Sequence, residues 1–304
     1  MQIFFYKGER VSEGVVNLRN KLRELGQNSL ILKHENSAFR GGDNKMLINW
    51  GCSNGDIQRL QGLPAQHLNM NNRVSMASNK KYFLELMTHA GVNIVPYFTS
   101  LREACQYLAA TRGRIYARTK LTASSGDGIV LLMREDDPQN NNEARRGNQY
   151  PILSVNGNGE FTGDVSMQMM RSINDCRLFT VGHIGQRVEW RAHVFNNKVI
   201  LLQKKVRTHG GEDANANTLV RNLNSGWVYS VNFDPQETDP IDVIKDVALA
   251  AVGAAGLDFG AVDIIVDKKT NTPRVLEVNT APGLDENGSA VNAYADAILE
   301  LANE

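Results

Sequence analysis

The chain has 304 residues, with 33 Lys and Arg against 33 Asp and Glu, so its formal net charge is zero. Hydrophobic residues make up 42% and charged residues 22%, which is typical of a folded globular protein and excludes global disorder. The balanced charge argues against a protein that works by neutralising nucleic-acid phosphates. The length predicts about two domains.

Three widely spaced cysteines, Cys52, Cys105 and Cys176, form no CxxC pair. This pattern predicts a reducing compartment with neither a disulfide framework nor a zinc ribbon. The N-terminal apolar stretch is too short for a signal peptide, and the apolar region 247–266 contains two aspartates and several glycines, so no membrane span is expected. We therefore expect a cytoplasmic protein without a membrane partner, and the sequence leaves a homo-oligomer open.

The first part of the chain has the pattern of a small α/β domain. A buried strand at 1–6 precedes a helix that begins at Ser12 and ends at Gly26, with apolar residues at helical spacing. Two further strands are expected at 29–32 and 46–49. Strand, helix and strand in this order predict an N-terminal α/β domain over residues 1–75.

The remaining residues, 76–304, mix helices with strands in an α+β pattern. In chain order, the expected elements are a helix from a cap at Ser78 or Asn79 to Gly91, a helix at 104–110, strands at 115–120, 129–133, 178–184, 189–195 and 198–206, a helix capped by Asp239 with Pro240 in its first position and reaching Gly256, and a final amphipathic helix that carries Val291, Tyr294, Ile298 and Leu301. The polar, Asn- and Gly-rich segment 134–163 is expected to be a long mobile excursion.

The stretch AVDIIVDKKTNTPRVLEVNTAPGL, residues 261–284, is the most informative part of the sequence. It predicts an antiparallel hairpin whose strands are 261–267 and 274–279. If the hairpin folds symmetrically about its turn, Asp267 faces Pro273, and this pair fixes the register of the whole hairpin.

That register places Asp263 directly opposite Glu277, with Cβ atoms ~4.5–5.5 Å apart, and puts Asn279 on the same face. Like charges at this distance repel unless a cation lies between them. Two carboxylates and an amide oxygen are hard ligands that suit Mg²⁺ or Mn²⁺. The sequence therefore predicts a metal site. The alternative is a solvated sheet face with a lysine neighbour, which the apolar flanking residues disfavour.

A loop of small residues, TASSGDG at 122–128, joins two apolar strands. Small residues let backbone N–H groups curl around a phosphate, and serine hydroxyls add donors. The loop matches neither GxGxxG nor GxxxxGK[ST], so an ordinary hairpin turn is the alternative. Arg118 and Lys120, on the strand that enters the loop, favour the phosphate interpretation.

Two more groups of charged residues have the same ambiguity. Asn79-Lys80-Lys81 places cations in the first turn of a helix, where the helix dipole favours anions. The alternating segment EWRAH puts Glu189, Arg191 and His193 on one strand face. The next strand follows with Lys204, Lys205 and Arg207. Solvated charged surfaces would have the same patterns, and a histidine on such a strand is more often structural than catalytic.

Taken together and in this order, the motifs resemble those of the ATP-grasp superfamily, and the likeness is closest to RimK-like carboxylate–amine ligases and their phage-encoded relatives. The segments that carry the resemblance are NKKYFLELMTHAGVNIVPYF, RTKLTASSGDGI, LFTVGHI, EWRAHV, QKKVR and LEVNTAPGL. It covers roughly residues 46–304, and nothing in it matches 134–163. It implies an α+β ATP-grasp fold, with two sub-domains that clamp ATP and a lid over about 112–184.

The resemblance also implies cofactors and site residues. ATP and Mg²⁺ (or Mn²⁺) are the implied cofactors, and the metal ligands are Asp263, Glu277 and Asn279. The implied nucleotide-binding residues are Lys80, Arg118, Lys120, Ser124, Ser125, Gly126, Gly128, Glu189 and an adenine hinge formed by Phe179, Thr180, Val181 and Gly182. The implied catalytic residues are Arg191, Lys204 and Asn222. Because the family usually has lysine as its second basic residue, Arg118 and Lys120 both remain candidates for that position.

The implied activity is ATP-dependent ligation of a carboxylate to an amine through an acyl phosphate, with release of ADP and phosphate. The substrates stay open among amino acids, peptides, protein termini and a modified nucleobase. Two alternatives are a kinase or phosphotransferase on the same fold and an inactive ATP-binding regulatory module. The intact set of Asp263, Glu277 and Asn279 argues against the inactive module.

Overall fold

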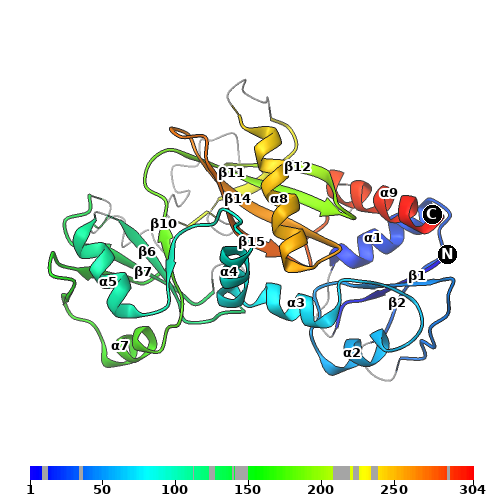
Figure 1. Ribbon diagram of the computed structural model, residues 1–304, viewed down its shortest axis with the longest axis horizontal. Helices are drawn as coiled ribbons and strands as arrows, with labels where there is room; N and C mark the ends of the chain where they lie inside the picture. Colours follow the sequence, from blue (N-terminus) through cyan, green and yellow to red (C-terminus); the bar gives the residue numbers. More distant parts are fainter. Residues whose placement is uncertain are drawn as a thin grey trace.

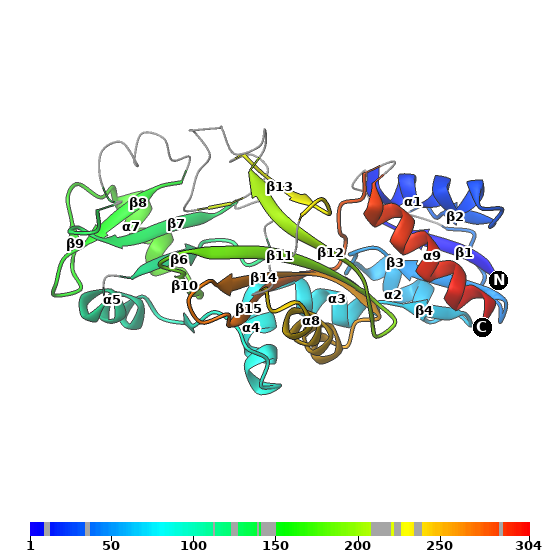
Figure 2. The same ribbon diagram turned by 90° about the horizontal axis from the view of Figure 1, so that it is seen from above.

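The structure is a computed structural model that describes residues 1–8, 13–33, 37–111, 113–122, 127–138, 140, 150–207, 220–221, 226–233, 239–285 and 288–304. Within these ranges the strands form three sheets, which follow one another along the long axis of the molecule (Figures 1 and 2). No helix in the same ranges is both long and apolar enough to cross a membrane.

The N-terminal sheet has the strand order β2-β1-β3-β4, and all its pairs are parallel. Its strands are β1 (Gln2–Tyr6), β2 (Ser29–Ile31), β3 (Lys45–Asn49) and β4 (Gln66–Leu68), with the helices α1 (Glu13–Glu24) and α2 (Gly55–Gln61) between them. The strand–helix–strand prediction is confirmed here. The predicted cap of α1, Ser12, lies outside the described residues.

The C-terminal helix α9 (Ser289–Asn303) lies beside α1 on this N-terminal sheet (Figure 2). Its apolar stripe, with Val291, Tyr294 and Ile298, shares one core with Ile3, Phe5 and other residues of the first sheet. The two ends of the chain therefore pack together, and the predicted boundary between residues 75 and 76 falls inside helix α3 (Asn71–Ser78).

The second sheet, which we call the lid sheet, has the order β5-β10-β6-β7-β8-β9 (left in Figure 1). Its elements are β5 (Tyr97–Phe98), α5 (Leu101–Ala110), β6 (Arg114–Arg118), β7 (Ile129–Arg134), β8 (Ile152–Val155), β9 (Phe161–Thr162), α7 (Met167–Asn174) and β10 (Phe179–Gly182). The helices α5 and α7 pack on the same core of this sheet. The prediction of a mobile excursion over 134–163 was wrong for its described second half, because β8 and β9 extend the sheet there.

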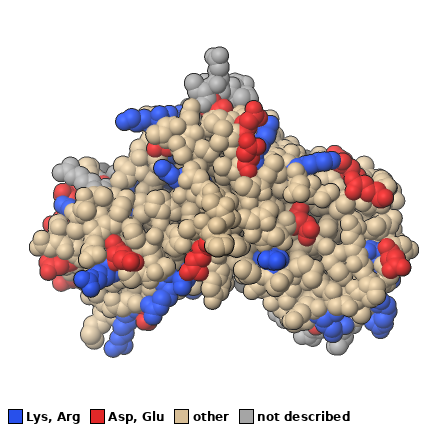
Figure 3. Space-filling view, in the orientation of Figure 1, with Lys and Arg blue, Asp and Glu red and all other residues tan. Residues whose placement is uncertain are grey.

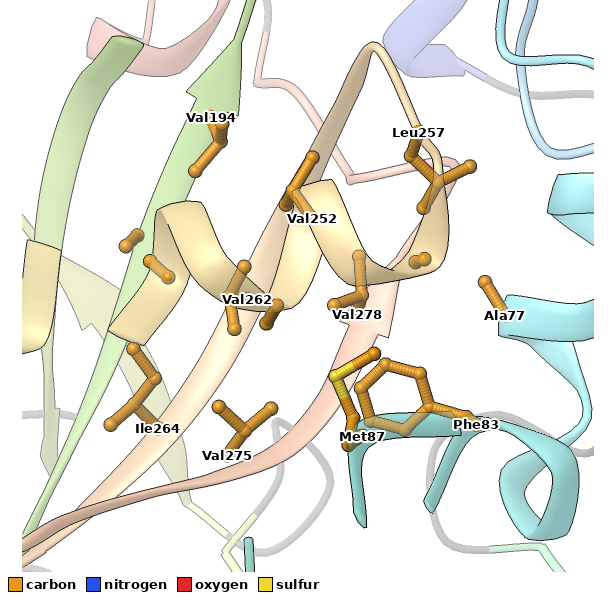
Figure 4. Close-up of a cluster of buried hydrophobic side chains, with 14 of the residues drawn as sticks. Ala77, Phe83, Met87, Val194, Val252, Leu257, Val262, Ile264, Val275 and Val278 are labelled. Atoms are coloured by element: carbon orange, nitrogen blue, oxygen red, sulfur yellow. The ribbon is translucent and has the colours of Figure 1, made fainter. Parts of the chain in front are cut away.

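The central sheet has the order β13-β12-β11-β14-β15, and every pair is antiparallel. Its strands are β11 (Arg187–Phe195), β12 (Lys198–Arg207), β13 (Trp227–Ser230), β14 (Phe259–Asp267) and β15 (Pro273–Asn279). Helices α8 (Ile241–Ala255) and α4 (Lys80–His89) cover one face. Figure 4 shows Val252 of α8 and Phe83 and Met87 of α4 among the valines and isoleucines of β14 and β15. Each such buried side chain contributes about 1.5–3 kcal/mol.

The two helices over the central sheet differ in how they begin. Of the two predicted cap residues, Asn79 is the one that caps α4, because its Oδ1 accepts hydrogen bonds from the N–H groups of Lys81 (3.1 Å) and Tyr82 (3.3 Å). The prediction that Asp239 caps α8 was wrong: Pro240 occupies the cap position without a side-chain bond, and the Asp239 carboxylate instead pairs with Lys204 at 3.2 Å. Helix α8 ends at Gly256 as expected.

Candidate active site

The face of the central sheet opposite α8 and α4 carries polar side chains. Trp190, Ala192, Val262 and Ile264 point toward α8, so their neighbours in the sequence point the opposite way. Across the strands, Arg191 faces Asp263, Asp263 faces Glu277, Ala261 faces Asn279, and Lys205 faces Tyr229. We call this surface the polar face, and most of the predicted chemistry lies on it.

The register of the β14–β15 hairpin brings the predicted metal ligands together. Asp263 lies opposite Glu277, as predicted. The position of the turn was wrong by one residue, because Val266 rather than Asp267 faces Pro273, and a bulge after Asp263 restores the register. Asp267 is drawn into the turn, where its Oδ1 accepts bonds from the N–H groups of Lys269 (2.7 Å) and Thr270 (3.1 Å).

The two facing carboxylates are each neutralised by a cation of the chain itself. Arg191 holds Asp263 with two bonds, Nε to Oδ1 at 2.7 Å and Nη2 to Oδ2 at 2.9 Å, and Lys80 at the start of α4 binds Glu277. Burial alone would raise the pKa of Asp263, but Arg191 outweighs it and holds that pKa below the ordinary value. The repulsion expected from the sequence is therefore relieved without a metal ion.

The donor set still fits a metal that is held jointly with a ligand. Among the described residues, no group of three His, Cys, Asp or Glu side chains is arranged to hold a metal, so oxygens from another molecule would be needed. The Asn279 amide nitrogen donates to the Ala261 carbonyl at 3.3 Å, which leaves its oxygen for a cation. Two carboxylates and one amide oxygen suit Mg²⁺, which keeps several water or phosphate ligands.

Arg118 and Lys120, the two candidates for the second basic residue, lie in different environments. The Arg118 Nε is buried and has no hydrogen-bond partner in the described part of the chain. Burial lowers the pKa of this guanidinium, an effect that Glu277 partly opposes. Lys120 is 59% exposed and pairs with Asp127 at 2.7 Å. The Arg118 guanidinium, close enough to Glu277 for their charges to interact, is suited to bind an anion through this Nε.

Gly128 closes the neck of the small-residue loop. Its carbonyl accepts bonds from the N–H (2.9 Å) and the hydroxyl (3.0 Å) of Thr119, and a Cβ on Gly128 would lie 2.8 Å from the same hydroxyl. With φ at +72°, the position favours glycine on backbone grounds as well. The predicted loop residues Ser124, Ser125 and Gly126, and the predicted catalytic Asn222, lie outside the described residues.

The structure corrects the placement of Lys204. Lys204 faces Trp190 on the covered side of the sheet, with its Nζ 5.0 Å from the centre of that ring and 3.2 Å from Asp239. It therefore does not share a face with Arg191. Its neighbour Lys205 does, and Lys205 Nζ lies 2.8 Å from Glu189 Oε2 and 4.7 Å from the Tyr229 ring centre.

Glu189 is buried, and its carboxylate is surrounded by basic side chains. Its carboxylate accepts bonds from Arg187 Nε (2.9 Å) and Lys205 Nζ (2.8 Å), and Arg221 Nε lies 3.7 Å away. Burial would raise its pKa, but Lys205 and Arg187 hold it below the ordinary value. Three cations around one buried carboxylate leave the described part of this cluster positively charged.

The predicted adenine hinge, Phe179 to Gly182, is strand β10 in the lid sheet. The Val181 N–H donates to the Pro96 carbonyl at 2.8 Å, but proline has no N–H with which to return the bond. The Val181 carbonyl therefore receives no hydrogen bond from Pro96. A carbonyl that reads a base must be free in this way to accept a bond from it. The Phe179 side chain is buried in the lid core, so this residue could meet a base only through its backbone.

His193 is structural, as its strand context suggested. It is 1% exposed, with Nε2 3.0 Å from Gln203 Oε1 and Nδ1 3.4 Å from the Tyr294 hydroxyl of α9. Burial, as the main cause, lowers its pKa to about 4. The contact ties the central sheet to the helix that covers the N-terminal sheet.

This low pKa predicts a pH dependence of stability. Because the unfolded state takes up a proton at pH ~6.5 and the folded state only near 4, stability present above pH ~7 is lost as the pH falls toward 4. We expect His193 to account for roughly 2 kcal/mol of the loss between pH 8 and pH 5. Urea unfolding of the wild type and His193→Gln at both pH values measures it, and equal losses in the two proteins would rule it out.

On the face shown in Figure 3, Lys and Arg side chains are scattered among Asp and Glu rather than gathered into one patch. This distribution, seen for the residues that the structure describes, agrees with the net charge of zero. It gives no support on this face to a nucleic-acid footprint.

The whole structure is similar to ATP-grasp ligases of known structure. ATP-grasp ligase PsnB, complexed with a minimal precursor, aligns with a TM-score of 0.64 at 12% identity over 99% of both chains. D-alanine–D-alanine ligase from Bacillus anthracis gives 0.60 at 14% identity over 100% of this chain and 97% of that one. A RimK-domain ATP-grasp protein from Sphaerobacter thermophilus gives 0.58 at 14% identity over 99% and 98%.

Similarity at the sequence level is restricted to a short stretch. A D-alanine–D-alanine ligase from Polynucleobacter asymbioticus is 36% identical over 69 residues, which is 20% of this chain and 20% of that protein. The matched stretch thus spans about a fifth of that relative's length. No protein-family model matches the chain. The chain has the ATP-grasp fold, which confirms the fold that the sequence resemblance implied.

Sequence reasoning missed Tyr229, Arg187 and Arg221 on or near the polar face. The Tyr229 ring lies 4.1 Å from the Arg191 guanidinium, and Arg221 lies 4.4 Å from the Trp227 ring. The alternation of Trp227 and Tyr229 on one short strand was the only local signal, and it does not say which cations they meet.

Proposed function

We propose that the protein is an ATP-dependent ligase that joins a carboxylate to an amine through an acyl phosphate. The observation that carries the proposal is the polar face itself. It gathers two facing carboxylates, Asp263 and Glu277, with Arg191 and Lys80 bound to them, and the unpartnered Arg118 of the lid sheet acts electrostatically on Glu277. The PsnB and D-alanine–D-alanine ligase likenesses support a C–N ligase.

In this proposal, Lys80 and Arg118 hold the ATP phosphates, and the hinge around Val181 reads adenine. Asp263, Glu277 and Asn279 would hold Mg²⁺ or Mn²⁺, which neutralises phosphate charge when bound. Solved complexes of PsnB contain Mg and ADP, which supports this pair of cofactors. The carboxylate of Glu189, which the resemblance places among the nucleotide-binding residues, already binds Arg187 and Lys205, and its contact with the nucleotide stays a prediction.

The reaction balances as two displacements. A substrate carboxylate oxygen attacks the γ-phosphorus, the bond to ADP breaks, and an acyl phosphate forms. The amine nitrogen then attacks the acyl carbon, loses a proton, and phosphate leaves with the former carboxylate oxygen. Arg191 and Lys205 would stabilise negative charge during both steps, since both lie on the polar face. We expect the loop at 122–128 to exclude water from the acyl phosphate.

The proposal specifies the chemical class of the substrates, a carboxylate and an amine, and not the individual compounds. PsnB is seen with precursor peptides, and D-alanine–D-alanine ligase is named for amino acids, so an amino acid, a peptide or a protein terminus is each compatible with the proposal. A screen of carboxylates and amines for ADP release, read by mass spectrometry, tests it. Condensed product with ADP supports the ligase, phosphorylated product with ADP favours a phosphotransferase, and nucleotide binding without turnover favours a regulatory module.

The two neighbouring lysines of β12 give a matched test of the polar face. Lys205→Met should lower turnover by roughly 10-fold or more, because a charge-assisted contact is lost from the face that carries Arg191. Lys204→Met removes the same charge from the covered face and should affect stability rather than turnover. Steady-state ADP release and urea unfolding measure the two effects. The opposite ranking in turnover would return the catalytic role to Lys204.

A further inference from the structure

Tyr229 lies on the polar face, where two cations contact its ring. It lies on the edge strand β13 opposite Lys205, and its ring centre is 4.7 Å from Lys205 Nζ and 4.1 Å from the Arg191 guanidinium. Both contacts are cation–π contacts, which fix a ring through its faces and do not involve the hydroxyl. The position of the Tyr229 oxygen is therefore set by the ring and by two cations of the proposed catalytic face.

The Tyr229 hydroxyl is buried and has no hydrogen-bond partner among the residues that the structure describes. Other buried tyrosines of this chain do have partners: the Tyr6 hydroxyl donates to Asn54 Oδ1 at 3.1 Å, and the Tyr294 hydroxyl lies 3.4 Å from His193 Nδ1. Buried polar groups are almost always paired, because an unmade bond costs the full loss of hydration. An orphaned hydroxyl on a functional face therefore indicates a ligand atom that completes it.

The surroundings of this hydroxyl define the chemistry of that atom. Burial, followed by the negative charge of Asp263, raises the pKa of Tyr229 well above its ordinary value, so the phenol keeps its proton and acts as a donor. The two charged groups that contact its ring, Arg191 and Lys205, are cations, which favour an anion beside them. A protonated donor flanked by cations fits an oxyanion.

We propose that Tyr229 is a catalytic residue whose hydroxyl donates a hydrogen bond to an oxyanion of the reacting group. The inference rests on the proposed function and deepens it. The oxyanion belongs either to the substrate carboxylate, and then to the acyl phosphate made from it, or to the γ-phosphate of ATP. The cation–π contact places Tyr229 against Arg191 rather than against Lys80 or Arg118, which favours the carboxylate.

The test is Tyr229→Phe, which keeps the ring and both cation–π contacts and removes only the oxygen. We expect kcat/KM for the carboxylate to fall by roughly 10- to 150-fold, the range for a hydrogen bond to a charged group. The melting temperature of the free protein should stay equal or rise, because the lost hydroxyl has no partner to lose. A merely structural role would instead lower the melting temperature and leave kcat/KM unchanged, which would overturn the proposal.

Tyr294→Phe is the matched control. It removes a buried hydroxyl that does have a partner, His193, and that lies in the packing between α9 and the two sheets. It should lower the melting temperature without the loss in kcat/KM.

The Kd of a non-hydrolysable ATP analogue separates the two sources of the oxyanion. A Kd unchanged by Tyr229→Phe, together with a lower kcat/KM, assigns the oxyanion to the carboxylate, and a weaker Kd assigns it to the γ-phosphate. If the wild type forms no product with any acid, the proposed function has failed. The Tyr229 inference is then decided by the analogue alone, and an equal Kd in wild type and Tyr229→Phe overturns it.

Discussion

Replacing Glu277 with Gln is expected to lower ATP turnover by at least roughly 100-fold while leaving the fold intact. Glu277 lies opposite Asp263, binds Lys80 and contributes to the field at Arg118, so it lies where the proposed phosphate and metal contacts meet. Gln keeps the shape of the side chain but loses the charge that attracts Mg²⁺. ADP release at saturating Mg²⁺ measures the loss.

A matched control for this variant is Glu300→Gln on α9. The carboxylate of Glu300 is exposed and binds the exposed Lys198 at the start of β12. An exposed ion pair of this kind contributes little. Turnover should stay at the wild-type level. Near wild-type turnover in Glu277→Gln would remove Glu277 from the site.

Arg118→Ala is expected to weaken ATP binding by roughly 10- to 150-fold, whereas Lys120→Ala should have little effect. Arg118 is buried with an unpartnered Nε and lies close enough to Glu277 for their charges to interact. Lys120 already has a partner in Asp127, and both of these side chains are exposed. Titration of both variants with ATP decides the ranking. The reverse order would give the phosphate contact to Lys120.

The sequence predicts best those contacts of the site that join residues close together in the chain. The β14–β15 hairpin spans few residues, and its apolar alternation fixes which side chains are buried, so the pairing of Asp263 with Glu277 could be predicted. The turn was predicted one residue away from its actual position, because Asp267 bonds to the turn backbone. The bulge after Asp263 compensates for this shift, so the predicted pairing of Asp263 with Glu277 is still correct.

The choice between Lys204 and Lys205 could not be made locally. Their face depends on how β12 pairs with β11, and that pairing contains a register shift between His193 and Val194. A shift of one residue moves every later side chain to the other face. The sequence shows two adjacent lysines, and only the packing of α8 against Trp190 decides which one is turned away.

Long-range packing accounts for most of the remaining differences. Nothing near Tyr229 in the sequence points to Arg191, 38 positions earlier, because the contact depends on the order of three strands. Likewise, the apolar stripe of α9 was predicted, but its place on the N-terminal sheet was not. The short strands β8 and β9 lie in a polar segment whose composition does not indicate a strand.

The central claim is that a substrate carboxylate becomes an acyl phosphate, and oxygen transfer tests it most directly. A carboxylate substrate found by the screen is labelled with ¹⁸O in its carboxylate oxygens and turned over with ATP and its amine. The account predicts that the released phosphate carries one ¹⁸O from the acid and that the amide keeps the other. Unlabelled phosphate beside a doubly labelled acid would show that ATP is consumed without activating the carboxylate, and would contradict the account.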